Sequence, residues 1–256
     1  MTRRIDRVKL LKPLIIACSM VVLPVVATAG EFQVSPIRLD LGKTAKSGVV
    51  TVSNVGNEKI NLQVQSTEWK QDNKGKDQYS ASTDIVYFPK IITLDKGDSQ
   101  MIRVGMKGAP PQSEKSYRLY IEEIPQPRKA EKGRAQVAIA IRFGVPIFIK
   151  PASESLKGLI DPITVVKGTA TALVRNAGNV HFRITTVTIT GRTADGQKIF
   201  TKEINGWYLL AGAERSYSDP IPPDVCRRLD HIQFDIKADL LTLSGTHQIN
   251  KEMCLP

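Results

Sequence analysis

The sequence is poor in the residues from which catalytic and metal-binding sites are built. Its 256 residues include only three cysteines and three histidines, and no C-x-x-C pair occurs. The histidines (His181, His231 and His247) are scattered through the second half. No G-x-S-x-G, H-E-x-x-H or glycine-rich phosphate-binding motif is present. These absences argue against a hydrolase, a metalloenzyme and a nucleotide-binding protein. We expect a protein that is not an enzyme and needs no cofactor.

One apolar run stands at the N-terminus, over residues 14–26, after several basic residues. It ends in the A-x-A pattern of residues 27–29, which is typical of a secretory signal peptide. Pro24 interrupts the run, which disfavours a membrane anchor, and Cys18 only loosely resembles a lipoprotein site. We therefore expect residues 1–29 to be cleaved and the protein to be exported.

Size and charge then limit the classes of partner. Removal of 29 of the 256 residues leaves 227, enough for one large or two ordinary domains. The net charge falls from +11 to +7, because the removed segment carries five basic residues and one acid. A moderately basic protein can bind anionic lipid, nucleic acid or an acidic protein. No basic run is interleaved with aromatic residues, so we expect no nucleic-acid partner.

Two cysteines remain after cleavage, Cys226 and Cys254. Export places them in an oxidising compartment, so a disulfide between them is the default expectation. The bridge would close a loop of about 29 residues and contribute roughly 3–4 kcal/mol in the chain-entropy model.

Almost no segment has a helical pattern, and strand-like runs recur between turn signals. In the first half they cover residues 32–41, 48–55, 60–69, 85–88, 99–106, 117–124 and 136–149. In the second half they cover residues 163–166, 169–176, 182–190, 198–204, 216–218, 231–238 and 246–251. Short strands with regular turns predict a β-sandwich, and seven strands in each half predict two of them.

An internal repeat supports this division. The segment TVSNVGNEKINLQV (51–64) resembles ALVRNAGNVHFRIT (172–185), and both contain an N-x-G-N turn at the same strand ordinal. Coincidence of common turn residues is the alternative. We place the border after Lys150, which gives an N-terminal domain of residues 30–150 and a C-terminal domain of residues 151–256.

Two segments look like loops. Residues 71–79 are polar and predict a hairpin tip, and residues 125–134 are charged and contain prolines. The second segment is either a solvated connector or a mobile loop beside a binding strand.

The segment AQVAIAIRFGVPIFIKP (135–151) has an unusually long alternating pattern. Every second residue is apolar: Val137, Ile139, Ile141, Phe143, Val145, Ile147 and Ile149. A central strand would bury this row inside its own domain. A strand at a sheet edge would expose it and invite pairing with a partner strand. Burial of four such side chains would contribute roughly 6–12 kcal/mol before association costs.

Four motifs in order resemble the periplasmic chaperones that guide pilus subunits in the chaperone–usher pathway. They are VSPIRLDL (34–41), YFPKIITLDKGDSQMIRV (87–104), YRLYIEEIP (117–125) and the strand of residues 135–151. The second motif carries the family's pattern through Pro89, Leu94, Gly97, Gln100 and Arg103. The resemblance covers nearly all of the mature sequence.

The resemblance implies two immunoglobulin-like β-sandwich domains in an L shape. It also implies that the seventh strand completes an unfinished subunit, a process called donor-strand complementation. The donor side chains would then be Val137, Ile139 and Ile141, with Phe143 as a further candidate. The subunit would be delivered to an outer-membrane usher, where the next subunit replaces the lent strand. The sequence does not say whether the free protein masks this strand by self-association.

The family holds the subunit's C-terminal carboxylate with two basic residues in the interdomain cleft. Arg38 matches the first. Pro146 stands where the best-known branch has the second, a lysine, and we expect Arg118 to supply this charge instead. A solvated Arg118 is the alternative. With the apolar Phe143 on the donor face, this departure hints at the branch called archaic.

The resemblance further implies an ionic network between the domains, for which Glu123, Lys150 and, less closely, Asp239 are the candidates. They could equally be ordinary surface charges. Two other functions remain open: a structural surface protein, such as a pilin-like or adhesin subunit, and a secreted hydrolase on a sandwich scaffold. The first would carry a free N-terminal donor segment, and the second would need a polar site that the sequence does not reveal.

Overall fold

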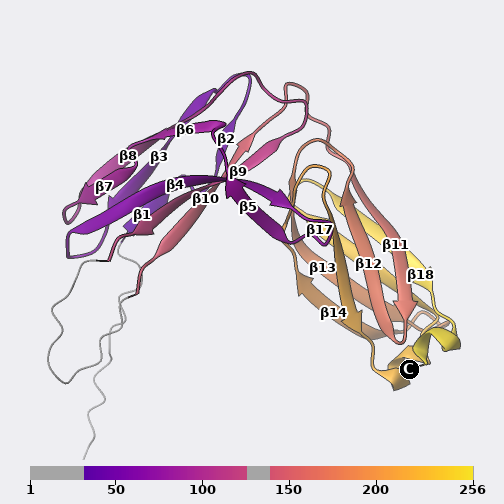
Figure 1. The fold of residues 1–256 in the computed structure, drawn as a ribbon. Coiled ribbons are helices and arrows are strands. Elements are labelled where there is room, and N and C mark those ends of the chain that lie inside the picture. The colour runs from indigo at the N-terminus through magenta and orange to yellow at the C-terminus, as the bar shows by residue number, and fades with distance from the viewer. Residues whose placement is uncertain (1–31, 126–138, 256) are drawn as a thin grey trace, which may run out of the picture.

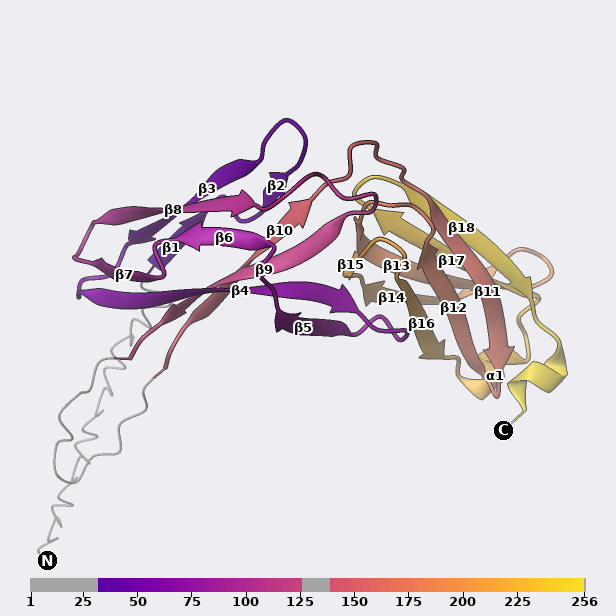
Figure 2. The same ribbon diagram turned by 45° about the horizontal axis from the view of Figure 1, so that its top comes forward.

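The computed structural model describes residues 32–125 and 139–255, and these residues form two β-sandwiches set at an angle in an L shape (Figure 1). Figure 2 shows that β4, β5, β9 and β10 lead from the first sandwich toward the second. The expected all-β, two-domain fold is confirmed. Neither helix of the described ranges has the length or hydropathy needed to span a bilayer.

The described residues of the first domain form ten strands in two sheets. The strands are β1 Phe32–Ser35, β2 Leu39–Leu41, β3 Ser47–Asn54, β4 Ile60–Gln71, β5 Asp77–Ala81, β6 Ile85–Phe88, β7 Ile91–Leu94, β8 Ser99–Met106, β9 Lys115–Glu123 and β10 Arg142–Ile149. One sheet has the order β1-β3-β8-β6. The other has the order β2-β10-β9-β4-β5, with β7 also paired to β4.

The second domain is built in the same way, with two short helices near its C-terminal end. Its elements are β11 Gly158–Val166, β12 Thr169–Asn176, β13 Phe182–Arg192, β14 Lys198–Asn205, β15 Tyr208–Leu209, β16 Glu214–Pro220, α1 Pro223–Cys226, β17 His231–Ala238, β18 Thr242–Gln248 and the 3-10 helix η1 Lys251–Cys254. The sheets have the orders β11-β12-β16 and β14-β13-β17-β18, and β15 pairs with β13.

Alternating side chains explain why each domain has its own core. In β3, Val50 and Val52 are fully buried, whereas Val49 is 39% exposed on the opposite face. This period of two sends one row of each strand into the space between the sheets. The cores are separate clusters, and the chain passes from one to the other between Lys150 and Gly158.

The two N-x-G-N turns are structurally equivalent. Asn54 and Asn176 are each at most 2% exposed. Each side-chain amide donates to backbone carbonyls of its own domain, and each side-chain oxygen accepts the N–H of the glycine two residues later. Because a buried amide must have its hydrogen bonds satisfied, asparagine recurs at this position in both domains.

Several segments differ from the sequence prediction; among the described residues, the strand expected at 136–149 begins at Arg142, and two further segments differ in their bounds. Residues 71–79 are not all loop, because β4 continues to Gln71 and β5 begins at Asp77. Likewise β11 starts at Gly158 rather than at residue 163, with an irregular register between Ile160 and Ile163. In both cases, pairing with a neighbouring strand extends the strand beyond the residues whose own pattern predicts it.

Cys226 and Cys254 form the predicted disulfide, with a Cα–Cα distance of 5.8 Å. It joins α1 to η1, and both cysteines belong to the second core. We expect replacement of both cysteines by serine to lower the free energy of unfolding of the second domain by about 3–4 kcal/mol. Urea unfolding followed by circular dichroism measures this. A loss below about 1 kcal/mol would contradict the structural role of the bridge.

Candidate functional site

Strand β10 has one paired edge and one edge that is largely free. On one side it pairs with β9 along its whole length, from Arg142 to Ile149. On the other side β2 pairs with Ile147–Ile149 only. No other strand in the described part of the chain pairs with residues 142–146 on that side. This stretch therefore presents an open edge to a partner strand.

The hydrogen-bond pattern identifies which backbone groups face this edge. Ile141 accepts a hydrogen bond from the N–H of Glu123, so the odd-numbered residues of β10 are bonded to β9. The even-numbered residues then turn their N–H and C=O outward, because the two sets alternate in an antiparallel pair. Lys150, which is even-numbered, accordingly donates its N–H to Leu41 near β2. At Arg142 and Gly144 the outward groups lie on the unpaired stretch.

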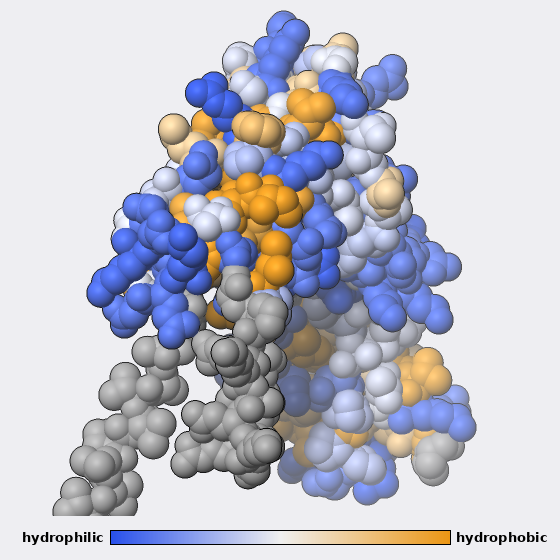
Figure 3. All heavy atoms as spheres, turned by 60° about the vertical axis from the view of Figure 1, so that its left-hand side comes forward, coloured by the Kyte–Doolittle hydropathy of each residue, from blue (hydrophilic) through white to orange (hydrophobic). Residues whose placement is uncertain are grey.

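The odd-numbered side chains of β10 run from the core out into solvent. Val145, Ile147 and Ile149 are at most 3% exposed. Phe143 is half-buried against the same core, and Ile139 is 79% exposed. Figure 3 shows apolar residues gathered on the side of the first domain that lies to the left in Figure 1. The apolar row therefore continues beyond the core that it serves.

These positions locate most of the predicted donor residues. Ile139, Ile141 and Phe143 lie at the open end of β10, and exposure increases from Phe143, which packs on the core, to Ile139. Val137 lies outside the described residues. The segment 126–138, which contains most of the predicted charged loop, is outside them as well.

Aromatic residues from both domains meet where the two sandwiches join. We call Trp69, Phe148, His181, Trp207 and Tyr208 the cleft cluster. Trp69 and Phe148 come from β4 and β10, and the other three come from the second domain. The rings of Phe148 and His181 are stacked with their centroids 3.6 Å apart, and Trp69 meets Tyr208 edge-on at 5.3 Å. The only two tryptophans of the sequence lie here, which is the one signal that could have predicted the cluster.

Arg118 lies against the cleft cluster and is only 8% exposed. Its guanidinium carbon is 4.0 Å from the ring centroid of Trp69 and 5.8 Å from that of Tyr208. Its Nε is buried and has no hydrogen-bond partner among the residues that the structure describes. An unsatisfied charged donor in a buried site is costly unless an acceptor binds there. Arg118 is thus buried at the junction of the two domains, and is not the solvated strand residue that the sequence left open.

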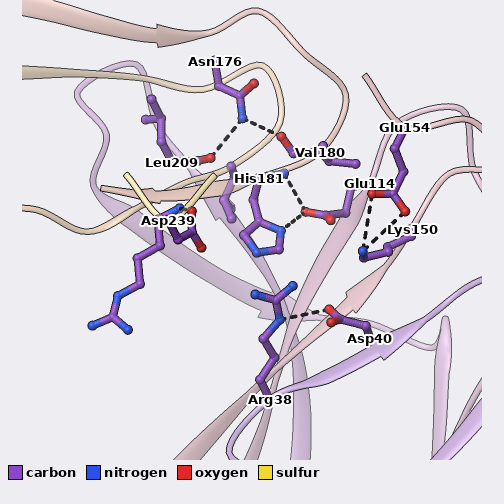
Figure 4. Close-up of polar contacts among 12 residues, drawn as sticks. Arg38, Asp40, Glu114, Lys150, Glu154, Asn176, Val180, His181, Leu209 and Asp239 are labelled. Atoms are coloured by element: carbon purple, nitrogen blue, oxygen red, sulfur yellow. Dashed lines mark hydrogen bonds and ion pairs between the residues drawn. The ribbon is translucent and has the colours of Figure 1, made fainter. Parts of the chain in front are cut away.

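Arg38 approaches the same cluster from the segment before β2. Its guanidinium carbon is 5.1 Å from the ring centroid of Phe148. Its Nε donates to the Asp40 carboxylate at 3.1 Å, and its side chain is 34% exposed (Figure 4). The two predicted anchor residues therefore border one aromatic cluster, with Arg118 buried and Arg38 partly open to solvent. Two guanidinium groups beside one aromatic cluster favour binding of an anion such as a carboxylate.

A buried polar pair that the sequence did not predict joins the domains. Glu114, just before β9, accepts hydrogen bonds from the backbone N–H of His181 at 3.1 Å and pairs with its Nδ1 at 2.6 Å (Figure 4). The side chains are 0% and 3% exposed, respectively. The residues are 67 positions apart in the sequence and belong to no motif, so no local signal links them.

The second N-x-G-N turn holds the segment that connects the domains. Asn179 donates its side-chain amide to the carbonyls of Ser153 and Gln112, at 2.9 and 3.1 Å. A Cβ on Gly178 would lie 2.2 Å from the Ser155 carbonyl oxygen, so only glycine allows this close approach. The turn therefore contacts both the connecting segment and the first domain.

We expect Glu114→Ala to loosen the arrangement of the two domains. The change leaves the His181 backbone N–H and imidazole buried without their acceptor, which costs about 1–3 kcal/mol for each lost bond. Distances between spin labels on the two domains should broaden, while the circular dichroism spectrum stays unchanged. Glu154→Ala, at an exposed carboxylate nearby, is the matched control. Equal distance distributions in both variants would contradict this role for Glu114.

The predicted ionic network is not formed. Glu123 lies opposite Ile141 and Lys150 follows Ile149, so about 30 Å of strand separates them. Lys150 pairs with Glu154 at 3.4 Å, and Asp239 accepts the backbone N–H of Arg183 in the second domain (Figure 4). We therefore correct the prediction. Glu123 lies at the end of β9 that is beside the start of β10, and Lys150 follows the opposite end of β10. The Glu114–His181 pair, in contrast, does join the two domains.

The hairpin of β4 and β5 also reaches the second domain. Gln71 donates to the carbonyl of Tyr208 at 2.8 Å and accepts the N–H of Leu210 at 3.0 Å. Asp77 accepts the indole N–H of Trp207 at 2.9 Å. Burial and the Asp77 carboxylate raise the pKa of Tyr79 to about 12, so this phenol stays neutral at physiological pH. Within residues 32–125 and 139–255, no cluster of metal-binding side chains occurs.

Residues 31–155 match the family model described as the pili and flagellar-assembly chaperone, PapD N-terminal domain. No curated protein matches the sequence. Residues 31–155, which include the first domain, therefore carry the N-terminal domain of this family of pilus assembly chaperones. Members of this family are not enzymes, and they are periplasmic.

Solved structures of similar fold cover nearly the whole described chain. One is the CsuC–CsuE complex of a chaperone and a tip adhesion subunit from archaic Csu pili of Acinetobacter baumannii. It has 18% identity and a TM-score of 0.60, and covers 85% of this chain and 98% of that chain. The class 5 fimbriae chaperone CfaA has 16% identity and a TM-score of 0.56, covering 84% and 98%. The Salmonella enterica complex of the SafA pilin with the SafB chaperone has 14% identity and a TM-score of 0.53, covering 87% and 98%.

Proposed function

We propose that the protein binds unfinished pilus subunits by lending them β10 as a missing strand. The observation that carries the proposal is the open edge of β10 together with the apolar row that leaves the core along it. Outward N–H and C=O groups at Arg142 and Gly144 supply main-chain hydrogen bonds to a partner strand. Ile139, Ile141 and Phe143 supply alternate side chains for its groove. Val137 is a fourth donor residue in this proposal.

Arg38 and Arg118 bind the C-terminal carboxylate of the subunit in this proposal. Both border the cleft cluster, and the Nε of Arg118 lacks an acceptor within the described chain. A carboxylate accepts up to four hydrogen bonds and pairs with guanidinium groups in a fixed geometry. Carboxylate binding at the cleft and strand pairing along β10 act on the same partner, because the cleft lies at the β2 end of the open edge.

The remaining parts of the proposal concern the pathway. Residues 1–29 are a signal peptide that directs the protein to the periplasm, and residues 30–150 and 151–256 are its two domains. The subunit passes to an outer-membrane usher, where another subunit's segment replaces β10. Structures of similar fold contain CsuC in complex with a tip adhesion subunit and SafB in complex with a pilin. Those complexes support a fimbrial subunit as the partner.

Co-expression in the periplasm with candidate fimbrial subunits tests this function. A tagged copy of the protein should co-purify with one subunit as a one-to-one complex that stays intact in size-exclusion chromatography. The subunit alone should aggregate or be degraded, because its core is incomplete. Stable accumulation of the subunit without this protein would contradict the chaperone function.

A further inference from the structure

Arg118 contacts the backbone of β10 as well as the cleft cluster. Its Nη1 donates to the carbonyl oxygen of Gly144 at 3.3 Å. Gly144 is one of the even-numbered residues whose carbonyl faces the open edge, because its odd-numbered neighbours bond to β9. The guanidinium therefore crosses β10 from its own position on β9 and reaches the edge that a partner strand would use.

The residues of β10 leave room for this crossing. Pro146 lies directly opposite Arg118, and Gly144 lies opposite Tyr120, on the same face of the sheet. A Cβ at position 144 would lie 3.0 Å from Cε1 of Tyr120 and 3.9 Å from Cδ of Arg118. Any side chain there would crowd the Tyr120 ring and stand beside the path of Arg118. Glycine thus keeps the path to the edge open.

Gly144 is the last residue along the open edge that turns both an N–H and a C=O outward. Pro146 has no N–H, and from Ile147 onward β2 occupies the edge. A partner strand that runs along the open edge toward the cleft must therefore end beside Gly144 and Pro146. The guanidinium of Arg118 already lies at this end point.

We propose that Arg118 covers the open edge at Gly144 in the unbound protein and that a chain-terminal carboxylate uncovers it. The inference rests on the proposed function and specifies which partner strands the edge accepts. A carboxylate can take two parallel charge-assisted bonds from a guanidinium, whereas the Gly144 carbonyl takes one bond from Arg118 and carries no charge. The unsatisfied Nε of Arg118 is one of the donors available for it.

The hydrogen bond from Arg118 to Gly144 distinguishes a partner strand that ends in a free carboxylate from other strands. An internal strand segment, or β10 of a second copy, brings no carboxylate to the cleft and leaves Arg118 on the Gly144 carbonyl. Exposed edges of sheets invite unwanted pairing, and charged side chains are a common means of preventing it. Arg118 thereby selects for a free C-terminus at the end of the partner strand.

Nuclear magnetic resonance of the full-length mature protein tests the proposal with a peptide probe. The probe is an N-acetylated Val-Thr-Val peptide with a free carboxylate, and the control peptide is its C-terminal amide. The free peptide should shift the Arg118 Nε–H signal and the Gly144 carbonyl carbon signal with the same midpoint. The amide should shift neither at equal concentration.

Substitutions of Arg118 and Arg38 separate the hydrogen bond to the Gly144 carbonyl from the positive charge. In Arg118→Met the unbound Gly144 carbonyl signal should already differ from its wild-type position, because the hydrogen bond from Arg118 is missing. Arg118→Lys, which keeps the charge but lacks the planar fork, is the second variant if the first folds poorly. In Arg38→Met the unbound Gly144 signal should be unchanged, since Arg38 does not contact this carbonyl.

Two results would overturn the inference. In the first, the carboxylate shifts the Arg118 signal but leaves the Gly144 carbonyl signal in place. In the second, Arg118→Met leaves the unbound Gly144 signal unchanged. In both cases the proposed function still stands if a donor-residue substitution abolishes subunit capture. If such a substitution leaves capture intact, the proposed function itself fails.

Discussion

Ile141→Asp should abolish capture of the subunit while the protein stays folded. Ile141 is half-buried at the open end of β10, where the proposed function places it in the subunit's groove. Burial of an isoleucine contributes about 1.5–3 kcal/mol, and a carboxylate in an apolar groove adds a further penalty of a few kcal/mol. A combined loss above about 3 kcal/mol lowers the affinity more than hundredfold. Titration of purified subunit complexes by competitive pulldown measures the affinity.

Two controls accompany this substitution. Val166→Asp places the same charge on an apolar side chain in the second domain that is 63% exposed. It should leave capture unchanged. Thermal unfolding of Ile141→Asp should differ little from the wild type, because the first core is completed by Val145 and Ile147 further along β10. Normal capture by the folded Ile141→Asp variant would show that β10 is not the lent strand.

Arg38→Met should weaken capture tenfold to hundredfold. Methionine retains an apolar chain against Phe148 but removes the guanidinium that faces the cleft. Loss of hydrogen bonds to a charged group costs about 1.5–3 kcal/mol, which corresponds to this range. Arg227→Met, at an exposed arginine after α1, is the matched control and should leave affinity unchanged.

The dependence on the carboxylate can be separated from other effects of the substitution. A subunit with an amidated C-terminus should bind wild type and Arg38→Met with similar affinity, because the partner of Arg38 is then missing. The four affinities form a double-mutant cycle whose coupling energy reports the ion pair. A tenfold effect of Arg38→Met on the amidated subunit would contradict carboxylate binding by this residue.

Much of the fold could be predicted from local patterns. Alternating apolar residues identified most strands, because one face of each strand is buried in a sandwich core. The asparagine repeated at positions 54 and 176 could be recognised in the sequence, because both side chains donate hydrogen bonds to buried backbone carbonyls. The strands at residues 77–81 and 208–209 were missed, because pairing with β4 and β13 stabilises them rather than their own sequence.

The site was predicted in part. The apolar row of residues 137–149 follows from its period of two. One edge of β10 is open because β2, which is distant in sequence, pairs with only three of its residues. No local sequence pattern encodes the extent of this pairing. The Glu114–His181 pair was missed because its partners are isolated in the sequence. The ionic network was wrong because family motifs gave residue types and not their positions along β9 and β10.

Hydrogen exchange at the backbone amides of β10 tests the central claim most directly. The N–H groups of Phe143 and Val145, in register with β9, should be protected with or without a subunit. The N–H groups of Arg142 and Gly144, which face the open edge, should exchange rapidly in the unbound protein and become protected in the complex. Rapid exchange at both residues in a stable complex would contradict strand lending by β10.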